Sequence, residues 1–70
     1  MEPHEQFGCN LRRLRKRRKL SQEALGRDCD LHPTEISRLE RAAREPRLST
    51  IVRLARALGV KPARMLDGIE

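Results

Sequence analysis

Two short segments with helical patterns lie on either side of a turn of only three or four residues, and this spacing constrains the fold most. The first segment begins at Ser21, a favourable N-cap residue, and runs to about Cys29. The second begins at Pro33, whose fixed φ suits the first position of a helix, and runs to about Ala42. Asp30 tolerates the left-handed conformation that a sharp turn needs. The pattern therefore predicts two helices that meet at a tight corner.

The rest of the chain is predicted to be helical as well, because no strand-like alternation or hairpin signal occurs in it. The expected helices cover residues 3–18, 21–29, 33–42, 49–58 and 62–67. The fourth should end at Gly59 and present one apolar face made of Leu48, Ile51, Leu54, Ala55 and Leu58. A chain of 70 residues fits one small all-α domain, here residues 1–70.

The charge of the chain indicates the class of partner. Sixteen Lys and Arg against ten Asp and Glu give a formal net charge of +6, which favours a polyanion. The single aromatic residue, Phe7, argues against single-stranded nucleic acid, whose bases stack on aromatic side chains. Duplex DNA is the better candidate. The run RRLRKRRK, residues 12–19, resembles a nuclear localisation or membrane-surface signal, but Leu14 interrupts it at helical spacing, which favours a solvated helix face on the DNA side.

Several classes of function are not expected. Cys9 and Cys29 do not combine with His4 and His32 at zinc-ligand spacing, so no metal or other cofactor is predicted. Two unrelated thiols, Cys9 exposed and Cys29 buried, suit a reducing compartment, and we expect a cytoplasmic protein. No membrane segment and no set of residues arranged for catalysis is evident, so neither a membrane protein nor an enzyme is predicted.

A helical wheel divides the segment 33–42 into two faces. The side expected to face the core holds Ile36, Leu39 and Ala43. The opposite side holds Thr34, Ser37, Arg38 and Arg41. These hydrogen-bonding side chains suit either a surface that reads DNA or an ordinary solvated face, and the wheel alone does not distinguish the two.

Glu40 lies on the core side of that wheel, where a carboxylate needs a cation because an unpaired buried charge costs several kcal/mol. In the first helix Phe7, Leu11 and Leu14 form the apolar face, and Arg15 flanks it. We therefore predict an ion pair between Arg15 and Glu40 that fixes the third helix on the first.

Four motifs together resemble the Cro/C1-type helix-turn-helix family, the lambda-repressor-like domains of phage repressors, restriction-modification controllers and many bacterial regulators. They are LSQEAL opening the second helix, ISRLE in the third, EPRL after it and LARALGV closing the fourth. The resemblance covers about residues 7–66. It implies a five-helix DNA-binding domain in which the second helix crosses the DNA backbone and the third enters the major groove.

The resemblance also implies roles for individual residues. The positions expected to contact bases are Pro33, Thr34 and Arg38, with Ser37 between them. The positions expected to contact phosphates are Gln22, Arg41, Arg44 and Arg47, to which we add the helix starts Ser21 and His32. For His32 a simple helix cap is the alternative. Arg15 and Glu40 match a structural ion pair of the family, whereas Lys19, Asp30 and Ala42 stand where the family usually has glycine.

The function expected from these observations is sequence-specific transcriptional regulation by a repressor or controller that binds a palindromic operator as a homodimer. The candidate dimer contacts are Val52, Val60, Met65 and Ile69, with core packing as the alternative for Met65 and Val60. Two alternatives remain. One is an antitoxin that binds both its operator and a toxin protein, and the other is the N-terminal DNA-reading domain of a longer ligand-sensing regulator.

Overall fold

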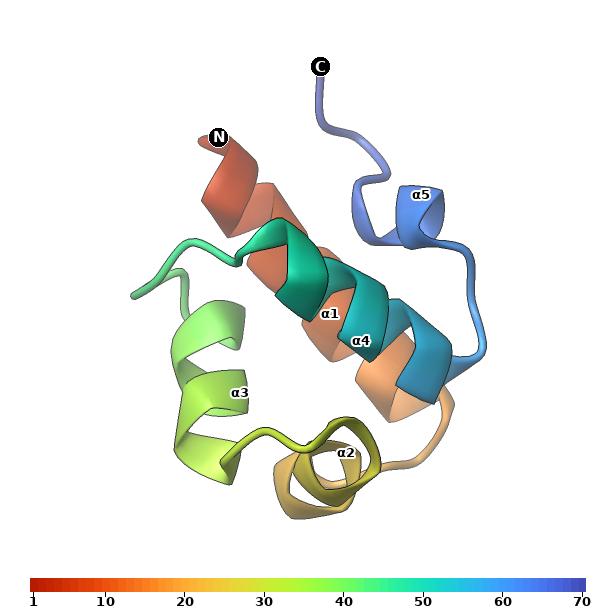
Figure 1. The fold of residues 1–70 in the computed structure, drawn as a ribbon. Coiled ribbons are helices and arrows are strands. Elements are labelled where there is room, and N and C mark those ends of the chain that lie inside the picture. The colour runs from red at the N-terminus through yellow and green to blue at the C-terminus, as the bar shows by residue number, and fades with distance from the viewer.

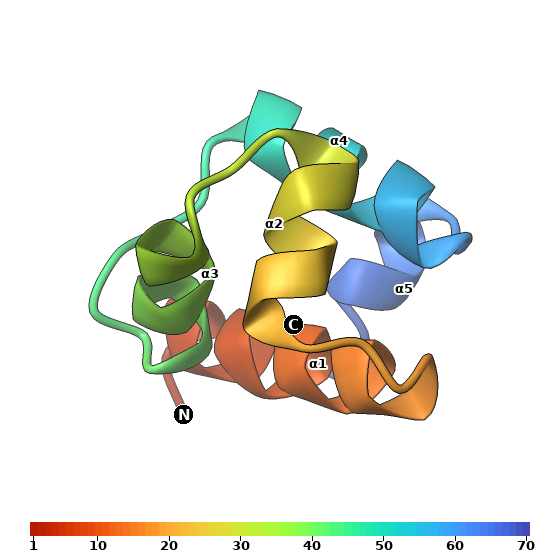
Figure 2. The same cartoon turned by 90° about the horizontal axis from the view of Figure 1, so that it is seen from below.

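The computed structural model describes all 70 residues, which form five α-helices and no strand, as predicted. The helices are α1 (Pro3–Arg17), α2 (Gln22–Cys29), α3 (Pro33–Glu40), α4 (Leu48–Leu58) and α5 (Pro62–Met65). In Figure 1 α4 lies in front of α1, with α2 below them and α3 and α5 on opposite sides. Figure 2 shows that α1 and α4 lie on opposite sides of the bundle and that α2 runs between them. None of the five helices has the length and apolar character needed to cross a bilayer.

The core contains eleven buried apolar residues drawn from all five helices, and Phe7, Leu11 and Leu14 of α1 are among them, as the sequence predicted. Leu48, expected on the core face of α4, is instead 77% exposed, because it is the first residue of that helix and no other element covers it. Met65 is completely buried, so it belongs to the core and not to a surface that a partner can reach.

The end of α3 differs from the prediction. The helix stops at Glu40, two residues early, because Ala42 adopts a left-handed conformation with φ of +60°. The amide of Ala43 then donates to the carbonyl of Arg38 at 2.8 Å, which closes the last turn. Ala43 consequently lies outside the helix and is exposed, so the prediction that it faces the core was wrong. Asp30 is left-handed as expected, with φ of +57°.

Two polar side chains attach the C-terminal part of the chain to α1. Asn10 is fully buried, and its Nδ2 donates to the carbonyls of Met65 and Asp67 at 2.9 and 2.8 Å. Arg18, just after α1, donates from Nη1 to the carbonyl of Leu58 at 2.7 Å. These bonds satisfy carbonyl groups at the ends of α5 and α4, which have no partners within their own helices.

Candidate nucleic-acid interface

The corner between α2 and α3 is defined by side-chain caps at the start of both helices. Figure 2 shows the two helices side by side, joined by a short turn. Ser21 Oγ accepts from the amide of Ala24 at 2.9 Å, and His32 Nδ1 accepts from the amide of Thr34 at 3.1 Å. His32 is therefore a helix cap, and its side chain is exposed at the corner.

The outer face of α3 carries the side chains predicted to read DNA. Thr34, Arg38 and Arg41 are exposed, whereas Pro33 and Ser37 are partly exposed. Ser37 Oγ accepts a hydrogen bond from Arg41 Nε at 3.2 Å, so these two side chains already contact each other. On the opposite side Ile36 and Leu39 are fully buried. The two faces expected from the wheel are thus present, apart from Ala43.

The predicted contact between Arg15 and Glu40 is present and holds α3 against α1. Arg15 Nε lies 2.5 Å from Glu40 Oε2, and Nη2 lies 3.0 Å from Oε1, in a bidentate arrangement. Gln22 Nε2 donates to the same Oε1 at 3.2 Å, so the start of α2 joins the pair. The hydrogen bonds that Arg15 donates to Glu40 raise the pKa of Arg15, and burial opposes this only in part. The guanidinium therefore remains charged while it is buried.

Gly8 permits the close approach of α1 and α3 beside this pair, a role that the sequence analysis missed. A Cβ atom at Gly8 would lie only 2.7 Å from the carbonyl oxygens of Leu39 and Glu40. Any other residue would push the end of α3 away from α1. The signal in the sequence was a glycine within a strong helical pattern. Glycine has a low helix propensity, so its presence inside a helix indicates that close packing requires it.

Arg53 of α4 holds the corner from the other side and was also missed. Its Nη2 donates to the carbonyls of Cys29 and Asp30, both at 2.6 Å, and its Nε donates to that of Cys29 at 3.1 Å. These carbonyls belong to the end of α2 and to the turn before α3, where helical partners are lacking. Arg53 thus fixes the turn that sets the direction of α3.

Two further arginines flank α3 on the loop that leads to α4. Arg44 Nη1 lies 3.5 Å from Glu35 Oε2, so an internal carboxylate balances part of its charge. Arg47 is exposed, forms no ion pair and occupies the N-cap position of α4. Together with Arg38 and Arg41, these residues give this side of the protein a positive potential.

The two thiols are free and form no disulfide. Cys9 is exposed on α1 and Cys29 is buried at the end of α2, as predicted. Burial raises the pKa of the Cys29 thiol, and the nearby Arg53 charge opposes this rise. No group of three or more His, Cys, Asp or Glu side chains is arranged to hold a metal ion.

Residues 6–67 match the family described as a helix-turn-helix domain. A curated relative is the control protein C.BamHI of Bacillus amyloliquefaciens, which is 44% identical over 62 residues. The matched segment covers 87% of this chain and 76% of that relative.

Solved structures of similar proteins have the same fold. The restriction-modification controller protein C.AhdI of Aeromonas hydrophila superimposes with a TM-score of 0.86 at 35% identity, covering 89% of this chain and 94% of that one. The P22 c2 repressor, solved with a synthetic operator, superimposes with a TM-score of 0.81 at 34% identity and the same coverage of each chain. The chain belongs to the lambda-repressor-like, Cro/C1-type family of helix-turn-helix DNA-binding proteins.

Proposed function

We propose that this protein is a transcriptional regulator, a repressor or controller, that binds a palindromic operator in duplex DNA as a homodimer. The observation that carries the proposal is the outward-facing stripe of Pro33, Thr34, Ser37 and Arg38 on α3, a helix whose inner face is locked in place. A helix of this width fits the major groove, where each base pair presents a distinct pattern of donors and acceptors.

Each residue of the stripe has a chemical role in this proposal. Arg38 donates in bidentate geometry to guanine O6 and N7, and Thr34 and Ser37 bond to neighbouring base edges. Pro33 has no amide hydrogen and contributes an apolar contact to a thymine methyl group. The phosphate ligands are Ser21, Gln22, His32, Arg41, Arg44 and Arg47, which border the stripe at the helix starts and on the following loop.

The functions of three relatives support this proposal. C.BamHI is a control protein, C.AhdI is a restriction-modification controller and the P22 c2 protein is a repressor in complex with operator DNA. A regulator of this kind acts on DNA in the cytoplasm, where the two free thiols also persist.

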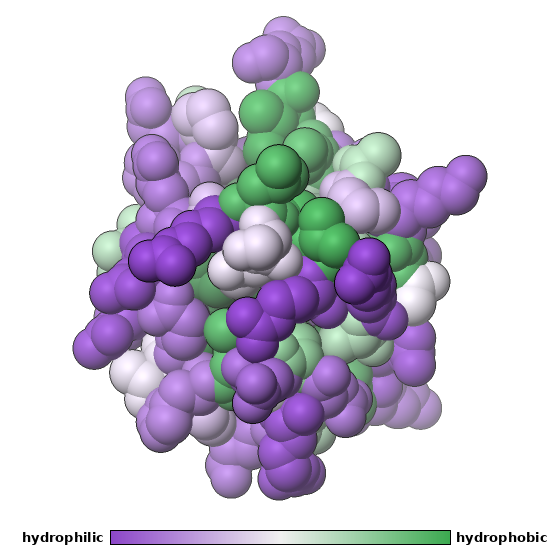
Figure 3. Space-filling view, in the orientation of Figure 1, coloured by the Kyte–Doolittle hydropathy of each residue, from purple (hydrophilic) through white to green (hydrophobic).

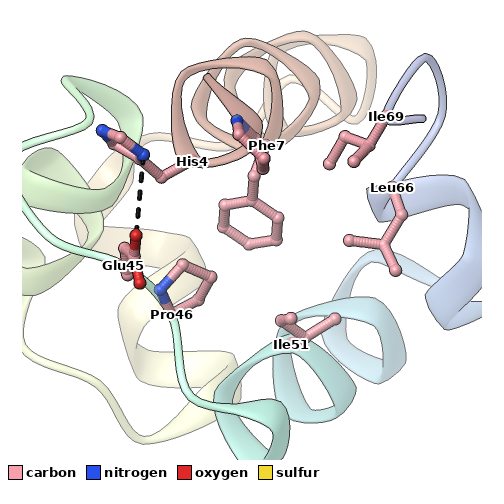
Figure 4. Close-up of a pocket in the computed structure, with 8 residues that line it drawn as sticks. His4, Phe7, Glu45, Pro46, Ile51, Leu66 and Ile69 are labelled. Atoms are coloured by element: carbon pink, nitrogen blue, oxygen red, sulfur yellow. Dashed lines mark ion pairs between the residues drawn. The ribbon is translucent and has the colours of Figure 1, made fainter.

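An apolar groove supports the homodimer. The groove has a volume of about 200 Å³ and lies between α1, the end of the α3–α4 loop, α4 and the C-terminal tail. Figure 4 shows the Phe7 ring facing Pro46, Ile51, Leu66 and Ile69 across it, with the His4–Glu45 ion pair of 3.7 Å at its rim. In Figure 3 apolar surface gathers on this side of the molecule, below the C-terminus.

A second copy of the chain is the occupant that suits the groove best. One reading helix covers only a few base pairs, and a two-fold dimer doubles the sequence that is read. Leu66 is 42% exposed and Ile69 partly exposed at the groove, so apolar area remains there for a partner to cover. The other candidate contacts, Val52 and Val60, are partly exposed but do not line the groove. Replacing Leu66 with Gln should shift the sedimentation of the protein from dimer to monomer. A wild-type protein that is monomeric at all concentrations would contradict the dimer.

Selection of bound sites from a random duplex pool tests the function itself. The wild-type protein should enrich a palindromic motif with half-sites about one helical turn apart. Arg38→Ala should enrich the same motif with preference lost at one base pair of each half-site. If the wild-type protein enriches no motif over bulk DNA, sequence-specific regulation is the wrong function for this fold.

A further inference from the structure

Six cationic side chains in the second half of α1 and in the turn after it take no part in the interface described above. They are Arg12, Arg13, Lys16, Arg17, Arg18 and Lys19, and all six are exposed. None of them forms an ion pair, and only Arg18 has a hydrogen-bond partner, the carbonyl of Leu58. We call this surface the α1 basic face. It holds six of the sixteen Lys and Arg residues of the chain.

This concentration of charge is unfavourable in the isolated protein. Arg12 and Lys16 are four residues apart on one helix, as are Arg13 and Arg17, and like charges at this spacing repel each other. The helix dipole favours cations only within the last turn of a helix. It therefore accounts for Lys16 and Arg17 but not for Arg12 and Arg13. An anionic surface that binds here would relieve the repulsion.

We propose that the α1 basic face binds the phosphate backbone of duplex DNA outside the groove that α3 reads. This inference rests on the proposed function. The face carries no exposed aliphatic or aromatic side chain, because Phe7, Leu11 and Leu14 of the same helix are all buried. It thus lacks the apolar anchors of a protein interface and the apolar side of a helix that lies on a membrane. Phosphates require only charge and hydrogen-bond donors, which arginine supplies.

The position of the face determines which phosphates it can reach. Figure 2 shows α1 along one edge of the bundle and α3 on another side, with the α1–α2 turn leading from α1 to the start of α2. Arg18 and Lys19 lie in that turn, next to the predicted phosphate ligands Ser21 and Gln22. The phosphates are therefore those of DNA flanking the site on the same duplex, or those of a second duplex.

The salt dependence of DNA binding tests the proposal. The double variants Arg12→Gln/Lys16→Gln and Arg13→Gln/Arg17→Gln each remove one repelling pair and keep good helix formers at both positions. The matched control, Arg56→Gln/Lys61→Gln, removes two exposed charges near the end of α4, where neither side chain has a polar partner. The probes are random-sequence duplexes of about two and about four helical turns. Circular dichroism verifies that each variant is folded.

The expected result is a weaker dependence of log K on log salt for the α1 variants, by up to about two units of slope, since each phosphate contributes roughly 0.9. The control should keep the wild-type slope. An effect confined to the longer duplex indicates flanking DNA, whereas bridging of two short duplexes indicates a second duplex, and both outcomes support the proposal. Slopes equal to that of the control on both probes overturn it.

Failure of this inference differs from failure of the proposed function. If Arg38→Ala alters base preference while the α1 variants keep the slope of the control, only the α1 basic face is misassigned. If the wild-type protein selects no motif but the α1 variants lower the salt slope, the protein contacts only the phosphate backbone of the DNA and reads no bases.

Discussion

Arg15 and Glu40 join α1 to α3 through two parallel hydrogen bonds, with only 10% and 5% of their side chains exposed. The carboxylate also accepts from Gln22, so one buried charge connects three helices. Such a pair contributes little net stability compared with apolar packing, but losing one member leaves a buried charge without a partner. The position of the reading helix therefore depends on both residues being present.

Replacing Glu40 with Ala should lower the free energy of unfolding by about 3 kcal/mol or more, because the buried Arg15 guanidinium loses its counter-charge. The double variant Arg15→Met/Glu40→Leu, which removes both charges and keeps similar volumes, should recover most of this loss. Urea unfolding followed by circular dichroism measures both. Asp67→Ala, which breaks the exposed Arg64–Asp67 pair, is the control and should change stability by less than about 1 kcal/mol. A double variant as unstable as Glu40→Ala would mean that packing, and not charge, sets the loss.

The Arg15–Glu40 contact could be predicted from the sequence because a carboxylate on the core side of a helix has few possible partners in so short a chain. The corner between α2 and α3 was predictable for a related reason. Its caps, Ser21 and His32 followed by Pro33, are local signals that act over three residues or fewer.

Features that depend on tertiary placement were not predictable. The acceptors of Arg53 are backbone carbonyls, which every residue carries, so nothing in the sequence distinguishes Arg53 from its neighbour Arg56. The need for Gly8 arises only once α3 lies against α1. The early end of α3 was missed because Ala42, a strong helix former, occupies the left-handed position where a glycine would have been a stop signal.

Arg38 and Arg47 should affect DNA binding in different ways. Arg38→Ala should cost about 1–3 kcal/mol of binding free energy at one base position and leave other positions unchanged. Arg47→Ala should weaken binding to all sequences alike and reduce the slope of log K against log salt by about one unit. Arg44→Ala should reduce the slope less, because Glu35 already balances part of the Arg44 charge. Binding curves on single-base variants of the selected site, at several salt concentrations, measure these effects. Loss of base preference in Arg47→Ala would reverse the two assignments.

Arg53 should influence DNA binding by positioning the corner rather than by touching DNA. Arg53→Gln loses most of the bonds to the carbonyls of Cys29 and Asp30, so affinity for the selected site should fall by about tenfold, the equivalent of about 1.4 kcal/mol. The salt slope should stay at the wild-type value, since no phosphate contact is lost.

Arg53→Lys should restore part of the affinity, because an ammonium group can reach one of the two carbonyls. Arg56→Gln, one turn closer to the end of α4 and with no polar contact, is the control and should bind as the wild type does. The measurements are made where each variant is fully folded by circular dichroism. A salt slope lowered by about one unit in Arg53→Gln would instead identify Arg53 as a phosphate ligand.

The two cysteines should differ in reactivity and in their effect on alkaline stability. Cys9 should react with a thiol reagent at once, and Cys29 only when the chain unfolds. Burial raises the pKa of Cys29, so the unfolded chain loses the thiol proton at a lower pH than the folded one. The contribution of Cys29 to stability should therefore be constant below the ordinary thiol pKa and decrease as the pH rises above it. Cys29→Ala should lack this decrease, while Cys9→Ser keeps it. Equal labelling rates for both thiols in the folded protein would contradict the buried position of Cys29.

The left-handed residue that ends α3 offers a way to stabilise the reading helix. Ala42 has φ of +60°, a conformation that costs a residue with a Cβ atom about 1–2 kcal/mol and costs glycine nothing comparable. Ala42→Gly should raise the free energy of unfolding by about 0.5–1 kcal/mol, after allowing for the greater freedom of glycine in the unfolded chain.

Ala43→Gly is the matched control: Ala43 is exposed and has no positive φ, so its replacement should lower stability by up to about 1 kcal/mol. Urea unfolding compares the two. Because Ala42 lies after the residues of α3 that are proposed to contact bases, a gain in stability should leave base preference unchanged. A loss equal to that of Ala43→Gly would show that the strain at Ala42 is relieved elsewhere in the loop.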